Sequence, residues 1–164
     1  MCCALAGRPL AQAVAAEEPE ATWEISHLGG HRFAPTMLVL PHGYLYGRLT
    51  PQMALDALSA TRQGRLSIPS CRGRSTWPRP GQAAEVALRK RLGDDIIDAV
   101  TIHCIETIAP NCWAVTACHT DGRRWSVLVE QTTPESSRKD GCQQQPSTPV
   151  QTHARSIQQL SPLS

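Results

Sequence analysis

The chain has 164 residues, of which 41% are hydrophobic and 18% are charged, with a net charge of +2 and an isoelectric point near 8.2. This composition is sufficient for a packed core, whereas the charge is too small for the basic face of a nucleic-acid-binding protein. No apolar run approaches the ~18–20 residues of a membrane-spanning helix. We therefore expect neither nucleic acid nor a membrane among the partners.

The N-terminal stretch resembles a secretion signal only in part. Residues 1–18 are mildly apolar, but no basic segment precedes the apolar run, and Arg8-Pro9 interrupts it. The chain also has seven cysteines and no C-x-x-C pair. Because an odd number of cysteines argues against a disulfide framework, we expect a cytoplasmic protein with free or metal-bound thiols.

The first part of the chain is predicted to form two helices and three strands around one loop. In chain order these are a helix over residues 4–16, a strand over 22–26, a loop over 27–35, strands over 37–40 and 44–49, and a helix over 51–63. We expect the first helix to become regular near Pro9, because proline is favoured in a first turn. Thr50 is the predicted N-cap of the second helix, and Gly64 follows its end.

The second part is predicted to be a helix followed by an antiparallel meander. The expected elements are a linker over residues 67–81, a helix over 82–93, strands over 96–109, 112–120 and 124–132, and disorder from Pro134 onward. Asp121-Gly122 is typical of the hairpin between the last two strands. The fold class is therefore α+β, with expected units at residues 1–68, 69–133 and 134–164.

The motif His27-Leu28-Gly29-Gly30-His31 is the strongest functional signal. Its two histidines have helical spacing, but each glycine costs up to ~1 kcal/mol in a helix, so a loop is expected. A glycine turn with two surface histidines would explain the pattern. A loop that wraps closely around a ligand held by both histidines would explain it as well, because glycine lets the main chain approach a ligand.

Three stretches resemble one known family. They are CCALAGRPLA, WEISHLGGHRFAPTMLVLPHGYLYGRLTP and RGRSTWPRPGQAAEVALRKRLG, and together they resemble the sucrase/ferredoxin-like family of bacterial proteins from Cys2 to about Gln131. The resemblance implies a thioredoxin-like ferredoxin domain, here without its first strand. Thioredoxin-like folds often carry a cis-proline beside the redox site, which implies a cis bond before Pro35.

The family resemblance implies a [2Fe–2S] cluster bound by two histidines and two cysteines. His27 and His31 match the histidine ligands, and Cys3 matches the second cysteine, with Cys2 as a substitute. The first cysteine, in a family segment resembling C-x-H-G-x-R-D-x-C-C, has no counterpart, so we expect an N-terminally truncated chain whose cluster binding is impaired. Gly29, Gly30 and Arg32 are expected beside the cluster.

The expected function is electron transfer to or from an unidentified redox partner protein, and the sequence does not indicate an oligomeric state. Imidazole ligands raise the potential of such clusters relative to thiolates and can couple electron uptake to proton uptake. The alternatives are a zinc-bound or metal-free structural module and a thiol-redox enzyme using Cys2 or Cys3. Sucrose hydrolysis is not supported, because it requires two carboxylates and Glu24 is the only acid near the motif.

Overall fold

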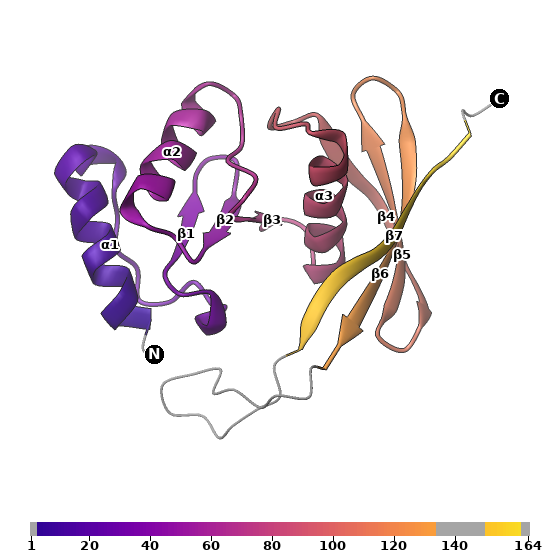
Figure 1. Cartoon of the computed structure of the whole chain (residues 1–164), viewed down its shortest axis with the longest axis horizontal. Coiled ribbons are helices and arrows are strands. Elements are labelled where there is room, and N and C mark those ends of the chain that lie inside the picture. Colours follow the sequence, from indigo (N-terminus) through magenta and orange to yellow (C-terminus); the bar gives the residue numbers. More distant parts are fainter. Residues whose placement is uncertain (1–2, 134–149, 162–164) are drawn as a thin grey trace.

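The computed structural model describes residues 3–133 and 150–161, with side chains from Leu5 onward. These residues form three α-helices and two antiparallel sheets, which confirms the predicted mixture of helices and antiparallel strands (Figure 1). The first sheet is covered by α1 and α2, whereas α3 lies between this sheet and the second one. No helix within the described residues is long and apolar enough to cross a membrane.

The first sheet has the order β1-β2-β3. Strands β1 (Thr36–Val39) and β2 (Tyr44–Gly47) form the predicted hairpin, in which Val39 pairs with Tyr44. Gly43 closes the turn with φ of 73°. Strand β3 (Cys71–Arg74) pairs antiparallel with β2, so the stretch predicted as a linker instead supplies the third strand. The proposed division into units stays a prediction.

Helices α1 (Cys3–Glu17) and α2 (Pro51–Arg62) bury their small and aliphatic residues against this sheet. As predicted, α2 begins after Thr50, whose hydroxyl accepts a hydrogen bond from the Met53 N–H. Helix α1 matches the predicted range of residues 4–16 to within one residue at each end, but it is already helical before Pro9, where its regular part was expected to begin. Proline removes one helical hydrogen bond, but burial of Leu10 and Val14 keeps the segment on the core.

Helix α3 (Arg79–Leu92) packs on the second sheet, which has the order β4-β5-β6-β7. Its strands are β4 (Val100–Ala109), β5 (Cys112–His119), β6 (Arg124–Thr132) and β7 (Gln151–Gln159). The core between helix and sheet includes Leu88, Val115, Trp125 and Val127, all buried. The predicted helix and three-stranded meander are therefore confirmed.

Two further expectations were wrong. Residues 22–26 form no strand: Trp23 is 84% exposed, and no strand in the described part of the chain pairs with this segment. Strand β7 lies in the stretch predicted to be disordered. It pairs with β6, which places Ile157 opposite Val127 and Ala154 opposite Val129. These apolar cross-strand contacts stabilise a strand whose other residues are mostly polar.

A buried polar network joins the two parts of the fold. The Tyr44 hydroxyl on β2 donates to Glu85 Oε1 on α3 at 2.7 Å, and Arg89 Nε donates to the same oxygen at 3.2 Å. Arg89 also donates to the carbonyl of Ile97, just before β4, at 2.6 Å. Because Glu85 and Arg89 are at most 1% exposed, these bonds hold β2, α3 and the segment that leads into β4 in a fixed arrangement.

Candidate metal centre

A left-handed glycine pair shapes the histidine loop. Gly29 and Gly30 have φ values of 79° and 71°, a region that residues with a Cβ rarely adopt. A 3-10 turn follows over His31–Phe33, in which the Phe33 N–H donates to the Gly30 carbonyl at 2.8 Å. The peptide bond between Ala34 and Pro35 is cis, in agreement with the prediction.

This turn brings the two motif histidines together. The ring centroids of His27 and His31 are 4.8 Å apart, and the ring planes are tilted by 43°. His27 is exposed and His31 is half-buried, so both rings can be reached from the protein surface. Two imidazoles at this separation can both turn a nitrogen toward one metal ion, which fits the chemistry expected from the motif.

The cysteine half of the predicted donor set lies outside the described side chains. Cys2 is outside the described residues, and Cys3 is the first residue of α1 but its side chain is not described. After α1 the chain runs back along the helix, so the glycine loop lies near the end at which α1 begins (Figure 1). Among the described residues, no three histidine, cysteine or acidic side chains gather as a metal site.

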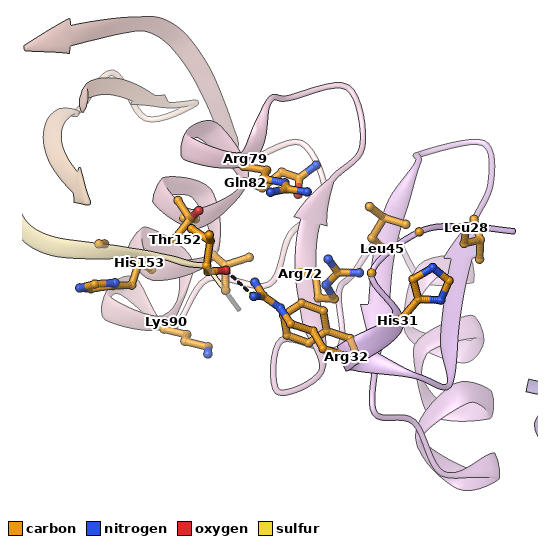
Figure 2. Close-up of a pocket in the computed structure, with 18 residues that line it drawn as sticks. Leu28, His31, Arg32, Leu45, Arg72, Arg79, Gln82, Lys90, Thr152 and His153 are labelled. Atoms are coloured by element: carbon orange, nitrogen blue, oxygen red, sulfur yellow. Dashed lines mark hydrogen bonds between the residues drawn. The ribbon is translucent and has the colours of Figure 1, made fainter. Parts of the chain in front are cut away.

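Arg32 extends away from His31 toward β7. It lies over the Phe33 ring, with 4.7 Å between its Cζ and the ring centroid, and Nη1 donates to the Val150 carbonyl (Figure 2). The expectation that Arg32 lies beside a cluster stays a prediction.

Arg72, which the sequence analysis did not single out, lies directly against the loop. Its guanidinium is 4.1 Å from the Phe33 ring centroid, and a Cβ added to Gly30 would lie only 2.8 Å from Arg72 Nη1. Burial, together with the neighbouring charges of Arg32 and Arg79, lowers the pKa of Arg72. The alternating Cys71-Arg72-Gly73-Arg74 pattern was the available signal, since it places Arg72 on one face of a short strand.

These features define a mixed α+β protein with a paired-histidine loop as its candidate metal centre. Within this class, residues 1–73 match the model of the Suc_Fer-like family, described as Sucrase/ferredoxin-like, which confirms the family resemblance for this segment. The matched segment includes the whole histidine loop and most of β3. The resemblance beyond residue 73 stays a prediction. No curated protein and no solved structure matched the chain.

Proposed function

We propose that this chain is an electron-transfer protein in which His27 and His31 bind one iron of a [2Fe–2S] cluster and Cys3 provides a thiolate, with Cys2 as a substitute. The observation that carries the proposal is the 4.8 Å separation of the two rings, in a segment that matches a ferredoxin-related family. A cluster with mixed ligation uses two imidazoles on one iron and thiolates on the other, so adjacent histidines suit this donor set.

When bound, such a group supplies a reversible one-electron redox step. The residues of this chain would control how closely the main chain approaches the group and how far the group is exposed to solvent. Gly29 and Gly30 have no side chain, so the loop's main chain can approach inorganic sulfide closely. His31 is anchored by the 3-10 turn, whereas His27 lies on an exposed part of the loop.

Anaerobic purification tests this proposal. We expect a coloured protein with visible absorption, containing iron and acid-labile sulfide in equal amounts but at less than one cluster per chain, because only three protein ligands are proposed. The replacement His31→Cys should lower the reduction potential, because a thiolate adds negative charge at the cluster. His103→Ala is the matched control, because His103 is exposed on β4 and should leave both spectrum and potential unchanged.

Three results would overturn the proposal. A colourless protein that contains stoichiometric zinc would support a structural metal site instead, and a colourless protein without metal would support a metal-free module. A coloured protein whose spectrum and potential do not respond to His31→Cys would remove His31 from the ligands.

A further inference from the structure

A cavity of about 830 Å³ separates the glycine loop from α3 and β7 (Figure 2). Its volume is within the range of about 300–1,000 Å³ that is typical of small-molecule sites. The 3-10 turn and β3 form one side, and residues of α3 and β7 form the other. The cavity therefore lies between the first sheet with its glycine loop on one side and α3 with strand β7 of the second sheet on the other.

Among the described residues, the charged side chains that line this cavity are all cationic. Arg72 comes from β3, Arg79 and Lys90 come from the first and last turns of α3, and Arg32 comes from the histidine loop. No aspartate or glutamate is among the described residues that line it. On a chain with a net charge of only +2, this concentration of positive charge is local.

Two neighbouring arginines, Arg74 and Arg89, are each neutralised by a carboxylate, whereas Arg72, Arg79 and Lys90 of the cavity have no such partner among the described residues. Arg74 pairs with Asp98 at 2.6 Å, and Arg89 pairs with Glu85 at 3.2 Å. Within the described part of the chain, no carboxylate lies within ion-pair distance of Arg72, Arg79 or Lys90. Arg72 is partly buried against Phe33 and repelled by its cationic neighbours, which lowers its pKa. An anion in the cavity would relieve this repulsion.

We propose that this cavity binds a small organic molecule bearing a phosphate group. Arg72 contacts the phosphate, because its planar guanidinium can donate two parallel hydrogen bonds to oxyanion oxygens. Arg79 and Lys90 supply further charge from the rim. The apolar side chains of Leu45 and Val86 also line the cavity and provide contact surface for the organic part.

The shape of the site favours this ligand over other anions. Several cations around one space match a group with two or more negative charges better than a single carboxylate. A concave space of this size suits a small molecule, whereas a nucleic acid would require an extended basic surface. Gly29, Gly30 and His31 of the proposed cluster loop also line the cavity, but Arg72, Arg79 and Lys90 are not proposed metal ligands, so variants at these three positions test phosphate binding separately from the cluster.

Calorimetric titration of the full chain at low ionic strength tests the site, with ADP and inorganic phosphate as probes and no added magnesium. The visible spectrum is recorded in parallel, so that iron extraction is not mistaken for binding. We expect ADP to bind more tightly than phosphate and both affinities to fall as salt is added. Arg72→Gln should weaken ADP binding by about tenfold or more.

Replacing the two exposed cations of the cavity tests the site without removing a side chain from the protein core. Arg79→Gln and Lys90→Gln, both at exposed positions, should each weaken ADP binding by about threefold. Arg48→Gln is the matched control: its guanidinium is 5.5 Å from the same Phe33 ring but does not line the cavity, so binding should not change.

Three results would overturn the proposal. The first is no heat of binding with either probe. The second is equal affinity in the wild type and in all three cavity variants. The third is a single-stranded oligonucleotide that binds more tightly than ADP and loses as much affinity in Arg48→Gln as in Arg72→Gln, which would indicate an open basic surface.

Discussion

The buried carboxylate of Glu85 joins β2, β3 and α3 through hydrogen bonds, and Glu85→Gln removes its charge while keeping its shape. In the wild type, Oε1 accepts from the Tyr44 hydroxyl and Arg89 Nε, and Oε2 accepts from the Arg74 N–H at 3.1 Å. A glutamine has only one acceptor oxygen. Its NH₂ group must therefore face a donor, and Arg89 loses its buried counter-charge.

The expected cost follows from this geometry. Breaking a fully buried ion pair by removing one partner costs about 3–5 kcal/mol, and Arg89 is only 1% exposed. Arg89 keeps its bonds to the carbonyls of Ile96 and Ile97, so we place Glu85→Gln near the lower end, at about 3 kcal/mol. With a urea m-value of about 2 kcal/mol/M, the unfolding midpoint should fall by about 1.5 M.

Urea unfolding followed by tryptophan fluorescence measures this shift, because Trp125 is buried in the core beside α3. Arg62→Gln is the control: it breaks the exposed pair with Glu18, and its midpoint should match the wild type. A decrease of less than about 0.3 M in Glu85→Gln would refute the reasoning, since it would mean that water or a neighbour compensates for the lost charge.

Three other predictions concern the backbone, a thiol and the last strand. Gly73→Ala should destabilise the protein by about 3 kcal/mol or more, because φ of Gly73 is 97° and the new Cβ would lie 2.8 Å from Gln82 Cα. Gly122→Ala, where the new Cβ would meet open space, should cost only about 1 kcal/mol. Equal urea midpoints for the two variants would contradict this reasoning. Burial raises the pKa of the Cys71 thiol to about 11. The thiol of the folded protein should therefore stay protonated at pH 8 and resist iodoacetamide, and it should react after unfolding. Rapid labelling of the folded protein would show that the thiol is accessible. The amides of Gln151–Gln159 that pair with β6 should exchange slowly with deuterated water, and complete exchange at the earliest time point would contradict strand β7.

Local signals accounted for the elements that the sequence predicted well. Thr50 and Gly64 bracket α2, Gly93 ends α3 in the left-handed conformation, and Asp121-Gly122 lies in the turn between β5 and β6. Each of these signals acts within a few residues of the position that it determines. Such elements can therefore be read from a short stretch of sequence.

The missed elements depend on partners that are distant in the chain. Strand β3 is four residues long and forms by pairing with β2, and β7 forms by pairing with β6. Residues 22–26 have the composition of a strand, but no described neighbour pairs with them. Strand formation requires such a neighbour, and sequence pattern alone does not identify it.

The candidate site also has a part that local sequence signals indicate and a part that they do not. The approach of His27 to His31 could be anticipated, because the intervening glycines permit a tight left-handed turn. The position of Arg72 beside the loop could not be anticipated, because Arg72 reaches the loop from β3, which is distant in the sequence. The cavity depends on the packing of α3 and β7 opposite the loop and so has no local signal in the sequence.

Pulsed electron paramagnetic resonance of the anaerobically purified, reduced protein tests the iron proposal most directly, because it detects nitrogen bound to the paramagnetic centre. We predict two strongly coupled nitrogens in the wild type, one in His31→Cys, and two in the His103→Ala control. A reduced centre without nitrogen coupling, or with a coupling that persists unchanged in His31→Cys, would contradict ligation by the paired histidines.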